Sequence, residues 1–171
     1  MFPAMSKLGC IAGRVQWESG TGAAVRAAAD AVGVSLISQL VDFPGNATTY
    51  GNAIAQAARD GSDAIMILDN PDVYTNRVSI VQSIAEARIP AIHAITSAVD
   101  AGGLMAYAFD LKEVWKRVAN DIDAILRGSN PADIPYYQVS KFELAINLKT
   151  AKALGLTVPP TLLASADKVV E

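Results

Sequence analysis

The sequence predicts an α/β protein whose mostly parallel β-sheet is covered by helices on both faces. Strand-like and helix-like segments alternate along the chain, which is typical of such a sheet. The segment 63–69, DAIMILD, is apolar on both faces of a strand, as expected in the middle of a sheet. Hydrophobic residues make up 51% of the chain and charged residues 18%, which provides enough apolar surface for a large core.

Five strands are expected in the first part of the chain, each a short apolar run that ends at a turn. They cover residues 7–13, 34–41, 63–69, 89–95 and 104–109. Their predicted order in the sheet is 2-1-3-4-5, one of the common orders of doubly wound α/β proteins. Strands one and three are then neighbours, so the turns that follow them should meet at one edge of the sheet.

Four helices should alternate with these strands, because each strand is followed by a turn and a segment rich in alanine or in charged residues. They are expected at residues 22–32 with Thr21 as the cap, in the segment ending near Arg59, from Thr75 or Asn76 to about Arg88, and from Asp110 to Gly128. Asp110 is followed three residues later by Glu113, which is the spacing of a capping box.

A C-terminal tail is expected to follow the α/β unit, which we place at residues 1–135. The tail, residues 136–171, should contain a strand over residues 142–147, a helix to about Leu156, a Pro-Pro break and a last short helix. A length of 171 residues fits one domain with such an appendage.

Charge and reactive residues exclude several classes of protein. The net charge is −3 and Lys and Arg form no run, so nucleic acid is a poor candidate partner. No apolar run approaches the ~18 residues of a membrane span. The single cysteine, Cys10, excludes an internal disulfide, and its apolar strand favours a place in the core. His93 has no cysteine or second histidine to share a metal ion, and we expect neither a metal site nor a cofactor.

The turn after the first strand, residues 14–21, is the first candidate binding site. Trp17, Glu18 and Ser19 lie there, just before a helix whose free N–H groups could hold a carboxylate or a phosphate. The alternative is that Ser19 and Thr21 cap the helix while Trp17 packs on a neighbour. The Lys-Ser/Thr pair of a phosphate loop is absent, which weakens any reading as a nucleotide site.

The turn after the third strand carries Asp69 and Asn70. Asp69 could accept hydrogen bonds from an ammonium or hydroxyl group of a ligand, and Asn70 could both donate and accept them. The alternative is an Asx turn around Pro71, in which both side chains bond their own backbone. Four more polar side chains near the ends of strands four and five could complete the rim, with a helix cap as the alternative for the last: Thr96, Ser97, Tyr107 and Asp110.

The chain lacks the residue patterns of a catalytic centre. It has no GxSxG turn, no Cys–His pair, and only one histidine that could act as a general base. A pocket of hydrogen-bonding groups without a nucleophile indicates binding rather than catalysis.

Two long motifs resemble the ABC-transporter substrate-binding-protein-like family. They are DAGGLMAYAFDLKEVWKRVANDIDAILRGSNPADIPYYQVSKFEL, residues 100–144, and FELAINLKTAKALGLTVPPTLLASADKVVE, residues 142–171. The resemblance implies a flavodoxin-like lobe of the periplasmic-binding-protein type I fold. It also implies the delivery of small solutes, such as amino acids, to an ABC permease.

The resemblance also extends to the candidate loops. Asp69 and Asn70 match the family's loop after the third strand of this lobe, and residues 15–19 and 96–103 match two others. Family members are much longer, with two similar lobes that close on a ligand. This chain resembles the second lobe and the tail, and the resemblance implies a tail that crosses back to the first lobe.

We therefore interpret the chain as a solute-binding lobe of an ABC-type uptake system, which binds a small molecule such as an amino acid without catalysis. Two alternatives stay open. One is a cytoplasmic metabolite-sensing or dimerising regulatory module derived from such a lobe, and the other is a small α/β enzyme.

The tail and the first residues lead to two further expectations. The apolar side chains of the tail should pack on their own sheet, or exchange with a second copy to form a homodimer, because they would otherwise be exposed. The segment MFPAMSKLGC lacks the basic start and apolar middle of a signal peptide. We expect the chain as written in the cytoplasm, and a piece of a longer exported protein in the periplasm or at the membrane.

Overall fold

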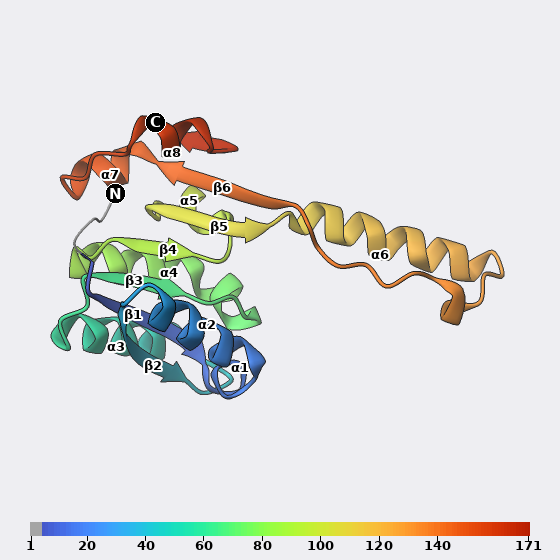
Figure 1. The fold of residues 1–171 in the computed structure, drawn as a ribbon, viewed down its shortest axis with the longest axis horizontal. Coiled ribbons are helices and arrows are strands. Elements are labelled where there is room, and N and C mark those ends of the chain that lie inside the picture. Colours follow the sequence, from blue (N-terminus) through green and yellow to red (C-terminus); the bar gives the residue numbers. More distant parts are fainter. Residues whose placement is uncertain (1–4) are drawn as a thin grey trace.

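The computed structural model describes residues 5–171 and contains one seven-stranded β-sheet. The strands lie in the order β2-β1-β3-β4-β5-β6-β7 (Figure 1). Their bounds are β1 (Lys7–Gly13), β2 (Ser35–Val41), β3 (Ala64–Ile67), β4 (Ala91–His93), β5 (Met105–Phe109), β6 (Phe142–Asn147) and β7 (Lys168–Val170). The predicted order 2-1-3-4-5 and the predicted α/β class are confirmed.

The sheet has two more strands than the five we predicted for the α/β unit. The first five strands are parallel, β6 runs antiparallel to β5, and β7 runs parallel to β6. The edge of β5 would otherwise present unpaired N–H and C=O groups, and the tail strand satisfies them. The sequence did not indicate β7, because three residues are too few to show an alternating pattern.

Eight α-helices and one short 3₁₀ helix connect the described strands. Their bounds are α1 (Arg14–Glu18), α2 (Gly20–Ala31), α3 (Ala47–Arg59), α4 (Pro71–Ala87), α5 (Ser97–Asp100), α6 (Leu111–Leu126), η1 (Pro131–Asp133), α7 (Leu148–Ala153) and α8 (Pro160–Ala164). The short helices α1 and α5 occupy segments that we expected to be turns.

Two helices begin earlier than the sequence predicted. Helix α2 starts at Gly20 because the Ser19 side chain, rather than that of Thr21, caps it. Helix α4 starts at Pro71, four residues before Thr75, because Asn70 caps it and a proline fits the first helical position without losing a needed N–H group.

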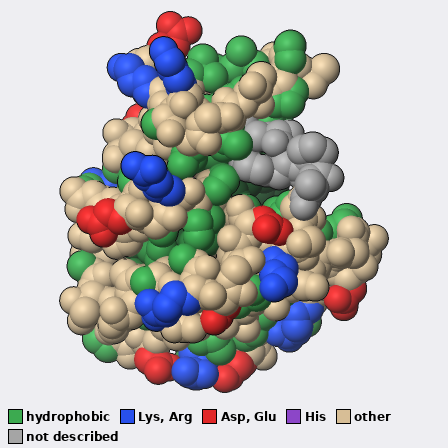
Figure 2. Space-filling view, turned by 90° about the vertical axis from the view of Figure 1, so that its left-hand side faces the viewer, with side chains coloured by type: hydrophobic (Ala, Val, Ile, Leu, Met, Phe, Trp, Pro, Cys, Tyr) green, Lys and Arg blue, Asp and Glu red, His purple; other side chains and the backbone are tan. Residues whose placement is uncertain are grey.

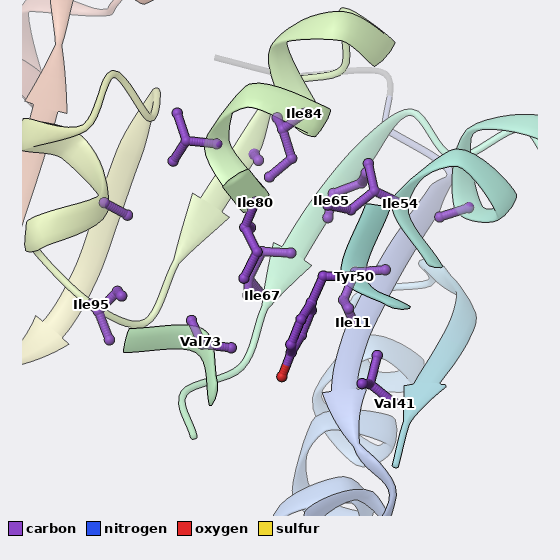
Figure 3. Close-up of a cluster of buried hydrophobic side chains, with 14 residues drawn as sticks. Ile11, Val41, Tyr50, Ile54, Ile65, Ile67, Val73, Ile80, Ile84 and Ile95 are labelled. Carbon is purple, nitrogen blue, oxygen red and sulfur yellow. The ribbon is translucent and has the colours of Figure 1, made fainter. Parts of the chain in front are cut away.

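Helices cover both faces of the sheet, as predicted. On one face, α3 and α4 enclose the larger part of the core, in which Tyr50 lies among aliphatic side chains of β1, β3 and α4 (Figure 3). On the other face, α1 and α2 cover a smaller cluster of Cys10, Ala12, Trp17 and Leu68. Because side chains alternate along a strand, Ile11 joins the first cluster while its neighbours join the second.

Helix α6 extends away from the sheet, beyond the ends of the parallel strands, and the connector to β6 runs back beside it (Figure 1). None of its residues is buried. Its exposed or half-exposed apolar side chains recur every four and three residues, which places them on one face of a helix. We call this set the α6 stripe: Leu111, Trp115, Val118, Ile122 and Ile125.

The tail packs on the sheet of its own chain. Ala145 and Ile146 of β6 are fully buried, and Ala145 shares a cluster with Val99, Ala106 and Val170. Of the two arrangements expected for the tail, this is the packing on its own sheet. The division of the chain at residue 135 stays a prediction, although the sheet runs without a break from one proposed part into the other.

The end of the molecule where the parallel strands begin carries mixed charges. Lys and Arg side chains are spread over this face among Asp and Glu, with apolar side chains between them (Figure 2). Within residues 5–171, no helix is long and apolar enough to cross a membrane.

Candidate functional site

The turns after β1, β2 and β3 meet at the carboxyl edge of the sheet and enclose a hollow of about 740 Å³, which we call the β1–β3 hollow. This is the edge at which open α/β sheets bind ligands. The hollow is lined by Gly13, Arg14, Val15, Gln16, Ser19, Asp42, Phe43, Asn70, Pro71 and Asp72.

A direct hydrogen bond joins the two turns that we expected to converge. The side-chain Nε2 of Gln16 donates to the backbone oxygen of Asp69 at 3.0 Å. The other end of this amide, Oε1, is buried and has no donor among the described residues. A buried acceptor without a donor is costly, so this atom is suited to a donor from a water molecule or a ligand.

Asn70 connects the hollow to the core. Its Oδ1 accepts a hydrogen bond from the Val73 N–H at 3.0 Å and another from the Tyr50 hydroxyl at 3.1 Å. Tyr50 is almost fully buried, and burial raises the pKa of its hydroxyl. Because Oδ1 already accepts two bonds, the amide group Nδ2 of Asn70 is the part that can serve a ligand.

Asp72 fixes the turn after β2 against helix α4. Its carboxylate accepts a hydrogen bond from the Gly45 N–H at 2.6 Å, while the Asn76 amide donates to the Gly45 oxygen at 3.3 Å. A Cβ atom on Gly45 would lie 2.8 Å from a Val41 methyl carbon and 2.9 Å from the Tyr50 ring. The close approach of this turn therefore needs a glycine.

The mouth of the hollow combines an ion pair with exposed apolar side chains. The Arg14 Nε donates to the Asp42 carboxylate at 2.6 Å. This hydrogen bond raises the pKa of Arg14 and lowers that of Asp42. Val15 and Phe43 are 81% and 75% exposed, so the mouth offers apolar surface to a ligand or a neighbouring domain.

The residues predicted for the turn after β1 have different places. Ser19 lines the hollow, although its hydroxyl is engaged in capping α2 and donates to the Gln16 oxygen. Trp17 is only 8% exposed and packs in the core, with the Arg26 guanidinium 5.1 Å from its ring. Glu18 is exposed and does not line the hollow. The alternative reading, capping and packing, describes Ser19 and Trp17.

Of the two residues predicted after β3, Asn70 lines the hollow and Asp69 lies beside it. The backbone of Asp69 bonds Gln16, whereas its half-buried carboxylate has no hydrogen-bond partner among the described residues. Its charge acts on Tyr74, where burial and then Asp69 raise the pKa of the hydroxyl. Their role in ligand binding stays a prediction.

Three predicted rim residues lie in a separate hollow of about 580 Å³ between α4, α5, β5, β6 and the start of α6. Thr96 and Ser97 line it, and so does Asp110. Asp110 also caps α6 and pairs with Lys141 at 2.9 Å, which lowers the pKa of its carboxyl group. Asp110 therefore acts as the N-cap of α6, which was the alternative we gave for it, and its role in ligand binding stays a prediction.

Tyr107 lines neither hollow. It alternates along β5 with the buried Ala106 and Ala108, so its ring points to the opposite face of the sheet. There it stacks on Phe142 of β6, with ring centroids 5.4 Å apart. The prediction placed it by its distance from the strand end, which does not determine the face.

Eight of the ten lining residues did not appear among the predicted ligands, and four of these eight contribute charged, amide or aromatic side chains from the turns after β1 and β2: Arg14, Gln16, Asp42 and Phe43. Two of them lie in the turn after β1, so the same topological argument already covered their positions. Asp42 and Phe43 follow β2, which is the other neighbour of β1. Applying the argument to all three adjacent strands would have found them.

The two residues with reactive side chains are buried. Burial raises the pKa of the Cys10 thiol to about 12 and lowers that of His93 to about 4. Neither ring nitrogen of His93 has a hydrogen-bond partner among the described residues. Within residues 5–171, no group of three or more His, Cys, Asp and Glu side chains could hold a metal ion.

Sequence comparison finds one family. The profile described as ABC transporter substrate binding protein matches residues 25–170, which is most of the chain. No curated protein sequence matches the chain.

Similar structures include three bacterial proteins. A conserved domain protein from Vibrio cholerae is 22% identical with a TM-score of 0.85, covering 98% of this chain and 55% of that one. An ABC domain in complex with L-Trp from Streptococcus pneumoniae is 23% identical with a TM-score of 0.85, covering 98% and 56%. A ligand-free substrate-binding protein from Clostridium difficile is 16% identical with a TM-score of 0.66, covering 98% and 55%. The chain thus spans about half the length of these structures.

Proposed function

Because the chain belongs to the ABC transporter substrate binding protein family, we propose that it binds a small amino-acid-like solute without catalysis and serves an ABC permease. The family match supports this function over the regulatory module. The L-Trp in the Streptococcus pneumoniae relative supports an amino acid as the class of solute.

The observation that carries the proposal is the convergence of three turns on the β1–β3 hollow. The Gln16–Asp69 hydrogen bond holds two of these turns together, and Asp72 holds the third through Gly45. The hollow combines apolar wall with a few fixed polar groups, which is the usual composition of a small-molecule site.

Three groups in the hollow or beside it could recognise an amino acid. The Asp69 carboxylate would accept hydrogen bonds from the ammonium group, and the Asn70 amide Nδ2 would donate to an oxygen of the solute. The exposed side chains of Val15 and Phe43 would cover an apolar side chain. None of these groups requires a nucleophile or a proton-transfer step.

A single lobe offers only an open site. Small-molecule pockets generally bury most of their ligand, whereas this hollow leaves one side of a solute in water. We expect a dissociation constant in roughly the millimolar range, corresponding to about −4 kcal/mol. A second lobe would strengthen binding by covering the open side.

The partners and the place of action are proposals as well. Besides the permease, a homodimer is proposed. The tail strand pairs within its own chain, so the α6 stripe, rather than the tail, is the surface that favours a second copy. If the chain is a piece of a longer exported protein, we propose that it acts in the periplasm or at the membrane, where it would meet its permease.

The proposal can be tested by calorimetry with a panel of L-amino acids at millimolar concentration. At least one should release binding heat with the wild-type chain, and Asp69→Asn should lose about tenfold in affinity because a charge-assisted hydrogen bond becomes a neutral one. Asp123→Asn, on α6 far from the hollow, is the matched control. No heat with any amino acid, or equal losses in both variants, would refute it.

A further inference from the structure

The β1–β3 hollow contains one cation. Among its ten lining residues Arg14 is the only Lys or Arg, whereas Asp42 and Asp72 are acidic. An amino acid brings a carboxylate as well as an ammonium group. In this hollow the carboxylate would face a surplus of negative charge unless it reached Arg14.

Arg14 is held in place but not used up by its partner. The Nε group of Arg14 donates a hydrogen bond to Oδ1 of Asp42 at an N···O distance of 2.6 Å, whereas the Nη groups have no hydrogen-bond partner among the described residues. A guanidinium carries five N–H donors in a planar fork, which matches the two oxygens of a carboxylate. The Nη groups of Arg14 can therefore bind a second carboxylate while the Asp42 carboxylate stays bound to Nε.

The order of the strands determines which way Arg14 points. It follows β1, and its partner Asp42 follows β2, so its side chain leans toward the β2 side of the hollow. Asp69 and Asn70 follow β3, on the other side of β1. The turn that carries Asp42, the partner of Arg14, and the turn that carries Asp69 thus lie on opposite sides of β1, which suits the opposite charges of a zwitterion.

We propose that Arg14 is a specificity-determining residue that binds the carboxylate of the solute, with Asp42 as the positioning residue that orients its guanidinium. This inference rests on the proposed function of the hollow. It assigns the carboxylate to the β2 side and the ammonium to Asp69, and it predicts selection for a free acid over its amide or ester.

The surroundings favour the addition of this second partner. The Arg14–Asp42 pair is exposed, and exposed pairs are weak, so Arg14 can accept a ligand carboxylate beside Asp42 at little cost. Val15 follows Arg14 in the sequence and Phe43 follows Asp42, so these two apolar side chains would shield the new pair from water when a solute binds.

The test compares L-phenylalanine with L-phenylalaninamide, in which a neutral carboxamide of nearly the same size replaces the carboxylate. Binding of both probes to the full chain is measured by calorimetry at about pH 6, where both amino groups carry a proton. The variants are Arg14→Gln, Asp42→Asn, and Arg127→Gln as the control. Arg127 forms a comparable ion pair with Asp123, at 2.9 Å, on α6 away from the hollow.

Wild type and Arg127→Gln should bind the acid about tenfold more tightly than the amide, as expected for one charge-assisted hydrogen-bonding partner. Arg14→Gln should reduce this preference to within about twofold, and Asp42→Asn should give an intermediate value. Circular dichroism should be unchanged, because all three substituted side chains lie at the surface.

Three results would overturn the inference. If Arg14→Gln kept the preference for the acid over the amide, or if wild type bound both probes equally, Arg14 would not be the group that recognises the carboxylate. The proposed solute binding would still hold in either case. If neither probe nor any other amino acid bound the wild-type chain, the proposed function would fail and this assignment with it.

Discussion

The hydrogen bond between Tyr50 and Asn70 couples the core to the candidate site, and a double-mutant cycle can measure this coupling. The Tyr50 hydroxyl donates to the Asn70 Oδ1 at 3.1 Å, and the same oxygen caps α4 through Val73. Tyr50→Phe removes one hydrogen bond but leaves the cap in place. We expect it to lower the free energy of unfolding by about 0.5–1.5 kcal/mol.

Asn70→Ala should cost more, because two penalties add. Loss of the N-cap costs about 1 kcal/mol. Tyr50 is only 1% exposed, and its hydroxyl is also left without an acceptor, which costs about 1–3 kcal/mol. In the double variant there is no hydroxyl to leave unpaired. Its cost should therefore fall short of the sum of the single variants by about 1–2 kcal/mol.

The assay is urea unfolding of the four proteins, followed by circular dichroism and analysed with one common slope. Additivity to within about 0.5 kcal/mol would show that the two side chains do not interact, and would refute the reasoning. Asn70→Asp separates stability from binding, because it keeps the capping oxygen and removes the Nδ2 donor. It should unfold like wild type but bind amino acids more weakly.

Three further predictions concern the core and α6. Burial lowers the pKa of His93 in the folded protein to about 4, so the unfolded state binds a proton first as the pH falls. Between pH 6.5 and 4 the free energy of unfolding should therefore fall by up to about 3 kcal/mol more in wild type than in His93→Asn. Parallel pH profiles from urea titrations would contradict this. Cys10, fully buried with its pKa raised to about 12, should react with Ellman's reagent at alkaline pH only after unfolding, and rapid labelling of the native protein would disprove its burial. Replacing both Trp115 and Ile122, which are 63% and 52% exposed, by lysine should change the free energy of unfolding by less than about 0.5 kcal/mol, whereas Ile54→Ala in the core should cost about 2–5 kcal/mol in the same assay. A comparable loss from the α6 pair would mean that α6 is covered in solution, by a second copy or otherwise.

Much of the fold follows from local patterns. The predicted bounds of β1 and β6 match the structure, because both are apolar runs with sharp polar or glycine boundaries. The start of α4 was wrong, because proline at residue 71 was taken as part of a turn. Proline is equally suited to the first turn of a helix, and the cap at Asn70 decides between the two.

Side-chain direction was harder to predict than position. The strand order correctly predicted that the turns after β1 and β3 meet, as the Gln16–Asp69 hydrogen bond confirms. It could not tell that Trp17 turns into the core or that Tyr107 faces away from both hollows. These directions depend on which helix covers which face, and no single segment contains that information.

The residue pattern, read without coordinates, is sufficient for the class of protein, the order of the first five strands and the edge at which a ligand would bind. These features depend on the spacing of apolar residues and on the chirality of strand–helix–strand connections, which act over short stretches of chain. Three features depend instead on contacts between distant segments: the pairing of β6 with β5, the exposure of the α6 stripe, and the Arg14–Asp42 pair at the mouth of the hollow. An apolar stripe shows that a surface needs covering, but its partner is selected by shape and hydrogen bonding across the folded molecule.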